Sequence, residues 1–323
     1  MRKIGKILVV LVILFGVVVL GAISYVKLAL PNVGDAPELK VEITKERVER
    51  GKYLANHVTV CIDCHSPRDW SKFSGPLDTT KIGIGGEKFD QKVGFPGEVY
   101  VPNITPYNLK HWTDGEIFRA ITTGVKKDGS AIFPFMPYKY YARMDKEDIY
   151  SIIAYLRTLR EQKTSFPERK LDFPLNVLVN TMPVPAAPGK RPSESNQLEY
   201  GRYLVNASAC VECHSKNEKG EIIAGSEFGG GRVFQIPNGK LTTPNITPHK
   251  ETGIGTWTKE MFINRFQQHA DAANATAVGP KDFQTIMPWT MYGSMKQSDL
   301  EAIYAYLRTV KPIENNVVKF VQE

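Results

Sequence analysis

The stretch Cys61-Ile62-Asp63-Cys64-His65 occurs a second time as Cys210-Val211-Glu212-Cys213-His214, and the two stretches use all four cysteines of this 323-residue chain. Cys-x-x-Cys-His is the attachment signature of c-type haem, in which two thiols add to the porphyrin vinyl groups and the histidine takes one axial position of the iron. Thiols at positions i and i+3 lie on one face of a helical turn, so both can reach one edge of the ring. The chain is therefore predicted to bind two covalent haems c. The expected attachment residues are Cys61, Cys64, Cys210 and Cys213, and the expected first iron ligands are His65 and His214.

Both signatures lie within a longer pattern that is repeated in the same order. The repeated segments are 51–54 and 201–204 (Gly-x-Tyr-Leu), 102–106 and 244–248 (Pro-Asn-Ile-Thr-Pro), 112–118 and 257–262 (Trp-Thr…Phe), 136–137 and 287–288 (Met-Pro), and 154–158 and 305–309 (Ala-Tyr-Leu-Arg-Thr). Such self-similarity predicts an internal duplication. We expect one domain at residues 40–165 and a second at 196–318.

A proline-rich linker, residues 166–195, joins the two expected domains. It contains the apolar stretch Leu171–Val179, which is too short to span a bilayer. We expect this linker to pack against one domain and not to act as a free tether.

The two copies differ in their loops. The distance from the signature histidine to the Asn-Ile-Thr loop is 38 residues in the first copy and 31 in the second. Conversely, residues 270–284 read as an insertion in the second copy. Loops vary where packing does not constrain them, so the two domains could differ in their partner contacts.

Helices are expected to form most of each copy, so the predicted fold class is mainly α. Thr113-x-x-Glu116 and Ser298-x-x-Glu301 match the capping box that opens a helix, and Asp145 can cap the first-copy counterpart of the last helix. Apolar residues at i, i+3, i+4 and i+7 predict that these last helices face a core. The residues concerned are Ile149, Ile152, Ile153 and Leu156, and in the second copy Leu300, Ile303, Tyr304 and Leu307.

The sixth iron ligand decides the chemistry, because an open position admits small molecules whereas a thioether gives an electron carrier of raised potential. Met136 and Met287 occupy equivalent places, each followed by proline and an aromatic residue. Proline fixes an extended turn that suits presentation of a thioether, so these two are the predicted ligands. Weaker candidates lie nearby or lack a counterpart in the other copy. They are Met144, Met182, Met291, Met295, His57, His111, His249 and His269.

Residues Ile7–Val26 form twenty positions without a charge, long enough to cross a bilayer core. Basic residues precede this stretch, which places the N-terminus in the cytoplasm and the haem domains on the periplasmic side of the bacterial plasma (inner) membrane. Residues 1–30 are therefore expected to be a single-pass anchor. The alternative is a signal peptide cleaved near Ala22-Ile23-Ser24.

The formal net charge of +7 does not indicate nucleic-acid binding. Four of the 41 basic residues, Arg2, Lys3, Lys6 and Lys27, flank the apolar stretch, and the remaining chain is only slightly basic.

Taken together, Gly-x-Tyr-Leu, Asn-Ile-Thr-Pro, Gly253-Ile-Gly-x-Trp257-Thr, Met-Pro and the final Ala-Tyr-Leu-Arg helix resemble the multihaem cytochrome c subunits of periplasmic alcohol, aldehyde and gluconate dehydrogenases. The resemblance covers about residues 45–318. It implies tandem cytochrome c-like domains, ligation by His65 with Met136 and by His214 with Met287, and electron transfer from a dehydrogenase. Those subunits usually carry three haem domains, whereas this chain has two signatures, and its first copy lacks the Gly-Ile-Gly before tryptophan.

The expected protein is a membrane-anchored dihaem c-type cytochrome without a catalytic site of its own. It would carry single electrons between a periplasmic dehydrogenase or quinol-linked donor and a respiratory acceptor, so its partners would be redox proteins such as a dehydrogenase, an oxidase or another cytochrome. The alternatives are a dihaem peroxidase-type enzyme and a haem-based sensor. Both need one open iron position, which two matching Met-Pro pairs would not leave.

Overall fold

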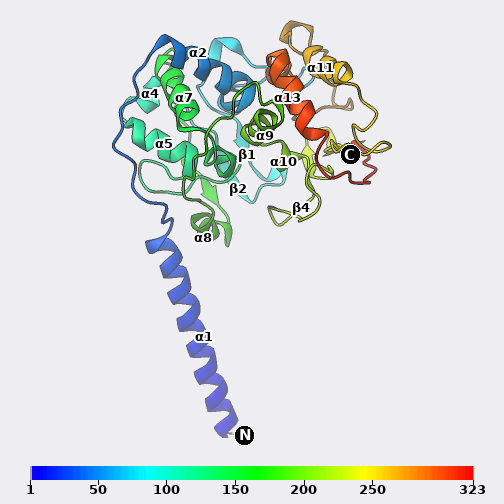
Figure 1. Ribbon diagram of the computed structural model, residues 1–323. Coiled ribbons are helices and arrows are strands. Elements are labelled where there is room, and N and C mark those ends of the chain that lie inside the picture. The colour runs from blue at the N-terminus through cyan, green and yellow to red at the C-terminus, as the bar shows by residue number, and fades with distance from the viewer. Residues whose placement is uncertain (1, 323) are drawn as a thin grey trace.

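A single long helix precedes a folded body in the computed structural model, which describes residues 2–322 (Figure 1). This helix, α1 (Arg2–Ala29), projects away from the body, and its apolar side chains are exposed along its length. It is long and apolar enough to cross a membrane, although a signal sequence has the same properties.

Helices form most of the regular structure of the body, as expected for a mainly α protein. The first half contains α2 (Lys45–Tyr53), the π-helical turn η1 (Leu54–Val58), α3 (Cys61–Cys64), η2 (Thr79–Lys81), η3 (Gln91–Val93), α4 (Pro106–Leu109), α5 (Asp114–Thr123), α6 (Tyr138–Tyr141) and α7 (Lys146–Thr158). The connecting segment contains α8 (Leu175–Leu178) and η4 (Val179–Thr181). The second half contains α9 (Gln197–Ala207), α10 (Cys210–Cys213), α11 (Lys259–Gln267), η5 (Ala272–Asn274), α12 (Trp289–Gly293) and α13 (Gln297–Leu307).

Each half also contains short antiparallel sheets. The first sheet has the order β1-β2-β3 and is formed by β1 (Lys88–Phe89), β2 (Gly97–Tyr100) and β3 (Lys170–Leu171). A hairpin, β4 (Asn217–Glu218) with β5 (Glu221–Ile222), and the sheet β6 (Val233–Ile236), β7 (Gly239–Thr242) and β8 (Phe320–Gln322) belong to the second half. In each half the chain returns after its last long helix and adds the third strand, so the repeated contacts extend to residues 170–171 and 320–322.

A glycine lies where the first and last long helices of each half cross. A Cβ atom added to Gly51 on α2 would lie 1.8 Å from the Ser151 carbonyl oxygen on α7. A Cβ atom added to Gly201 on α9 would lie 1.9 Å from the Ala302 carbonyl oxygen on α13. Only glycine allows backbones to approach this closely, which explains the glycine of the repeated Gly-x-Tyr-Leu segment.

Helix caps agree with the sequence at two places and disagree at a third. Thr113 and Glu116 form the expected capping box of α5, and the Asp145 carboxylate caps α7. The capping box expected at Ser298 is wrong, because α13 begins at Gln297, its N-cap Lys296 has no side-chain bond, and Ser298 lies inside the first turn. There the backbone N–H of Lys296 donates instead to the hydroxyl of Tyr53 from the first half, at 3.1 Å.

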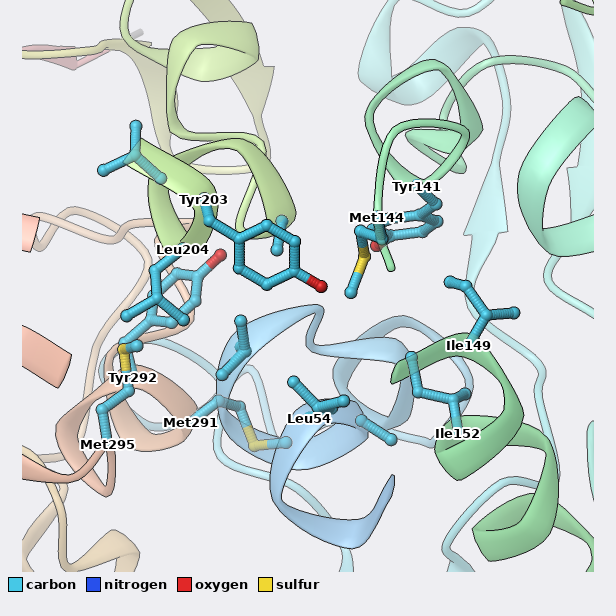
Figure 2. Packing of buried hydrophobic residues seen from close by; sticks show 14 of the residues in the cluster. Leu54, Tyr141, Met144, Ile149, Ile152, Tyr203, Leu204, Met291, Tyr292 and Met295 are labelled. Atoms are coloured by element: carbon cyan, nitrogen blue, oxygen red, sulfur yellow. The ribbon is translucent and has the colours of Figure 1, made fainter. Parts of the chain in front are cut away.

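One continuous hydrophobic core runs through both halves. The predicted stripes of α7 and α13 face it, with Ile153 and Leu300 fully buried. Figure 2 shows Leu54 and Met144 of the first half facing the same interior as Tyr203 of the second. Met144, Met291 and Met295, the weaker ligand candidates near the Met-Pro pairs, are buried in this core.

The connecting segment packs against the first half, as expected. Besides the strand β3, the backbone N–H groups of Val184 and Ala187 donate to the carbonyls of Thr123 and Ala142 at 3.1 and 2.9 Å. Near α8, the Asn180 amide donates to a carbonyl at the end of α1 at 3.3 Å. The segment thereby connects the long N-terminal helix to the body (Figure 1).

Candidate haem-attachment sites

The two cysteines of each signature lie at the two ends of a four-residue helix. Val60 and Ala209, just before these helices, adopt left-handed φ values of 45° and 49°. This conformation is uncommon for non-glycine residues, and least expected for a β-branched valine. It turns the chain sharply into α3 and α10, so the same local geometry presents the thiols of both signatures.

Each signature histidine is oriented by a backbone carbonyl far away in the sequence. His65 Nδ1 lies 2.8 Å from the carbonyl oxygen of Pro102, and His214 Nδ1 lies 2.8 Å from that of Pro244. A hydrogen bond at Nδ1 sets the tautomer and leaves Nε2 as the metal-binding nitrogen. Burial lowers the pKa of both imidazoles and outweighs the opposing effect of these carbonyls. Neutral imidazole is the form that binds a metal.

The Asn-Ile-Thr-Pro loop explains why these carbonyls are in place. The Asn103 side-chain oxygen accepts from the backbone N–H and the hydroxyl of Thr105, both at 2.7 Å, while its amide donates to the Gln162 carbonyl at 2.8 Å. Asn245 makes the equivalent bonds to Thr247 and to a carbonyl that follows the last helix, that of Ile313. A buried asparagine therefore ties the loop to the end of each half.

A glycine completes each histidine-binding loop. Gly85 and Gly230 donate from their N–H groups to the carbonyls of His65 and His214, both at 2.8 Å. Their φ values are +75° and +71°, and a Cβ at Gly85 would lie 2.4 Å from the Val101 carbonyl oxygen. These two positions allow the loop to close tightly around the histidine.

Met136 and Met287 occupy the same turn in the two halves. The N–H of Tyr138 donates to the Met136 carbonyl, and the N–H of Trp289 donates to the Met287 carbonyl, both at 2.8 Å across the intervening proline. The prolines have φ, ψ of −80°, 50° and −78°, 66°, which are inverse γ-turn values. Proline rigidifies this turn, so each thioether projects from a fixed backbone position.

A tyrosine connects each methionine turn with the matching signature. Tyr141, on α6 just after the Met136 turn, donates from its hydroxyl to the Thr59 carbonyl at 2.8 Å. Tyr292, on α12, donates to the Ser208 carbonyl at 3.1 Å. Thr59 and Ser208 each lie two residues before the first signature cysteine. The helices that follow the Met136 and Met287 turns are thus joined, by equivalent contacts, to the residues that precede the first and second signatures.

The acidic residue inside each signature pairs with an arginine. Asp63 and Arg68 form a buried 2.9 Å ion pair, and Glu212 pairs with Arg232 at 2.5 Å. Burial raises the pKa of the Asp63 carboxyl, and Arg68 opposes this effect. Sequence reasoning missed both arginines, since they lie at unequal distances after the two signatures.

The two approaches to the signatures differ by one residue. Leu54 precedes Cys61 by seven residues, whereas Leu204 precedes Cys210 by six, and the first half accommodates the extra residue as the π-helical turn Leu54–Val58. Such π-turns commonly mark an insertion into an α-helix. His57 lies in this turn, and its Nδ1 contacts the Met291 carbonyl at 2.9 Å. This histidine therefore contacts the opposite half and has no histidine counterpart there.

These residues fit c-type haem. Each half offers two thiols on one short helix, an imidazole oriented through Nδ1, and a thioether on a rigid turn. Nitrogen and sulfur are the donor set that haem iron receives in cytochromes c.

Residues 198–311 match the protein family described as cytochrome c, a region that covers the second copy. A match to this family implies covalently bound haem c. The chain is also similar to the fructose dehydrogenase cytochrome subunit of Gluconobacter japonicus, with 27% identity over 281 residues, or 81% of this chain and 52% of that protein. Its similarity to the cytochrome c subunit of alcohol dehydrogenase (quinone) from Gluconobacter oxydans is 25% over 281 residues, or 82% of this chain and 55% of that subunit.

The chain thus spans about half the length of these two relatives. A diheme cytochrome c-type protein of Cereibacter sphaeroides matches with 27% identity over 288 residues, which is 86% of this chain and 90% of that protein. These matches confirm the predicted resemblance to the cytochrome c subunits of dehydrogenases.

Proposed function

We propose that this chain is a membrane-anchored dihaem c-type cytochrome that carries single electrons from a periplasmic dehydrogenase or quinol-linked donor to a respiratory acceptor. The observation that carries the proposal is the repeated histidine geometry. In both halves the signature histidine binds a proline carbonyl through Nδ1 at 2.8 Å, and an equivalent Met-Pro turn follows later in the same half.

Two tandem haem domains, residues 40–165 and 196–318, are the proposed working units. Cys61 with Cys64 and Cys210 with Cys213 would hold the two haems covalently. His65 with Met136 and His214 with Met287 would supply the axial ligands. When bound in this way, a haem supplies one-electron reduction and oxidation at a potential raised by the thioether ligand.

The role of the surrounding protein groups is to orient the ligand side chains. Pro102 and Pro244 orient the imidazoles through their carbonyls, and the γ-turns hold the thioethers. Filling both axial positions leaves no place for substrate, which favours a carrier over a peroxidase-type enzyme or a haem-based gas sensor. An electron carrier needs its ligands, its burial and a docking face, and needs no catalytic side chain.

A dehydrogenase donor is supported by the names of the relatives. The relatives from Gluconobacter are cytochrome subunits of a fructose dehydrogenase and of a quinone-dependent alcohol dehydrogenase. The proposed location is the periplasmic side of the bacterial inner membrane, with α1 retained as a single-pass anchor. This location is supported by the exposed apolar surface of α1 and by the basic residues that precede its apolar stretch.

The test is to replace each predicted ligand methionine by alanine in the full-length protein. Met136→Ala and Met287→Ala should each keep two attached haems, remove half of the near-red methionine-to-iron absorption band, and lower one of two reduction potentials. Met182→Ala, in the connecting segment, is the matched control and should change neither property.

The same samples discriminate the alternatives. If the reduced wild-type protein binds carbon monoxide, the proposed carrier function is wrong and a sensor is favoured. If the wild-type protein turns over peroxide, an enzyme is favoured. Two low-spin haems that do neither would support the carrier.

A further inference from the structure

The two loop extensions that distinguish the halves meet in space. Phe73, in the longer loop of the first half, donates from its N–H to the Thr276 carbonyl at 2.8 Å, and Val278 donates back to the Ser71 carbonyl at 2.8 Å. Thr276 and Val278 belong to residues 270–284, the apparent insertion of the second half. The unequal parts of the duplication therefore form a joint structure of their own.

This joint structure ends at the Met287 turn. The Ser74 hydroxyl donates to the Met287 carbonyl at 2.6 Å and accepts from the Trp289 N–H at 3.1 Å, so it bridges both sides of Pro288. Ser74 is only 1% exposed and has a left-handed φ of 65°. A buried serine held in this sparsely populated conformation must be stabilised by its surroundings.

Gln284 holds the Ser74 backbone from the second half. Its side-chain oxygen accepts from the Ser74 N–H at 2.8 Å, while its amide donates to the carbonyls of Trp70 and Lys72 at 3.2 and 2.9 Å. Gln284 is itself buried. The Gln284 oxygen also accepts from the Thr285 N–H at 2.9 Å. The amide group thus makes three hydrogen bonds to the loop of the first half.

Arg68 holds the same loop from the side of the first signature. Its guanidinium donates to the Ser74 carbonyl at 2.7 Å and to the Gly75 carbonyl at 2.9 Å, and it pairs with Asp63. The guanidinium also lies 4.1 Å from the centre of the Trp70 ring. A continuous set of contacts therefore runs from the first signature, through Arg68 and Ser74, to the Met287 turn of the second half.

The Met136 turn has no equivalent support. Among the hydrogen bonds of residues 2–322, none joins a side chain to the Met136 carbonyl or to the Tyr138 N–H. The N–H of Met287 also donates to the Thr285 hydroxyl at 3.1 Å, whereas that of Met136 donates to the Phe133 carbonyl at 3.4 Å. The two turns thus differ in their side-chain support.

We propose that Ser74 is a positioning residue for the second haem, holding the Met287 thioether at its iron from the loop of the first half. This inference rests on the proposed function, because it requires Met287 to be the sixth ligand. Through Arg68 and Ser74, the loop that follows the first signature would influence the strength of the bond between Met287 and the iron of the second haem.

The experiment compares Ser74→Ala and Ser74→Gly with wild type in the full-length protein. Glycine adopts positive φ freely, so Ser74→Gly removes the hydroxyl without adding backbone strain and guards against misfolding. Both variants should keep two haems, lose up to half of the near-red band, and let one reduced haem bind carbon monoxide. One reduction potential should fall while the other remains unchanged. Ser151→Ala, a buried serine that bonds only to its own helix, is the matched control and should have no such effect.

Met287→Ala, measured alongside, separates the two proposals. In one outcome, Met287→Ala removes half of the near-red band while both Ser74 variants keep the band, the reduction potentials and the carbon monoxide binding of wild type. In that outcome the positioning role of Ser74 is wrong and the assignment of Met287 as ligand stands. If Met287→Ala also changes nothing, the ligand assignment fails and the positioning role fails with it. A Ser74 effect on both haems equally would also overturn the proposal, since the Ser74 hydroxyl bonds to the Met287 turn and not to the Met136 turn.

Discussion

The hydroxyl of Tyr53, in the first half, donates a 2.6 Å hydrogen bond to the carboxylate of Asp299 in the second half. The hydroxyl of Tyr203, in the second half, donates an equivalent 2.7 Å hydrogen bond to the carboxylate of Asp148 in the first. Both tyrosines come from the repeated Gly-x-Tyr-Leu segment. Each also accepts a backbone N–H near the start of the opposite half's last long helix, from Lys296 at 3.1 Å and from Asp145 at 3.2 Å. The two halves are therefore joined by a reciprocal pair of contacts.

Removing either tyrosine hydroxyl should loosen this junction. Tyr53→Phe removes the donor to the Oδ2 atom of the buried Asp299 carboxylate and the acceptor of the Lys296 N–H. It should lower the free energy of unfolding by about 1–3 kcal/mol in a denaturant titration, the usual cost of an unpaired buried polar group. Tyr203→Phe should cost less, because Asp148 keeps its ion pairs with Arg50 and Arg191. Tyr107→Phe, at a partly exposed tyrosine, serves as the control. Unfolding energies equal to that of wild type would show that the junction adds no stability.

The helix crossings should not tolerate a methyl group. Gly51→Ala and Gly201→Ala place a Cβ within 2 Å of a carbonyl oxygen on the facing helix, so the helices must separate. Overpacking of this kind should cost about 2 kcal/mol or more of unfolding free energy. The neighbouring exposed substitutions Lys52→Ala and Arg202→Ala are the controls. An alanine variant as stable as its control would mean that the helices can shift freely.

The stability of the protein should fall in mild acid through His57. Burial lowers the pKa of this imidazole, the Met291 carbonyl opposes the effect, and nearby Lys52 adds to it. The unfolded chain takes up the proton near pH 6.5 while the folded chain resists it, so stability present above this pH is lost as the pH falls below it. His57→Gln should flatten this part of the curve of unfolding free energy between pH 8 and 5. The control is His111→Gln, at an exposed histidine, and an equal slope in both variants would contradict the prediction.

Loss of the cysteines of one signature should abolish haem attachment at that signature alone. Replacing Cys61 and Cys64 together by alanine should leave one covalent haem per chain, and the same replacement of Cys210 and Cys213 should leave the other. Covalent haem is counted by mass spectrometry of the purified chain. Two haems in either double variant would show that the signature is not the attachment site.

The N-terminal helix should decide where the protein resides. Wild type is expected in the membrane fraction after an alkaline wash, with its N-terminus intact. Replacement of residues 1–29 by a cleavable secretory signal should release a soluble dihaem protein into the periplasm. Soluble wild type that begins near Ile23 or Ser24 would identify the segment as a cleaved signal peptide.

Several features of the candidate sites could be predicted from the sequence because they depend on residues close together in the chain. The spacing of cysteines and histidine in each signature is set by one helical turn, and the stripes of α7 and α13 follow helical periodicity. The Thr113 capping box is equally local, and it formed as expected. The Ser298 box did not form, because contacts from the opposite half organise that helix start.

By itself, therefore, the sequence determined the repeated motifs, the helical character and the predicted attachment residues, since covalent spacing and side-chain periodicity are local properties. Only the tertiary structure decided which groups support the predicted ligands. The Pro102 carbonyl lies 37 residues from His65, and Ser74 lies 213 residues from the Met287 turn. The sequence showed that the two copies differ in loop length, but not that the longer loops meet. Such pairings depend on how the two halves pack against each other, which no local pattern specifies.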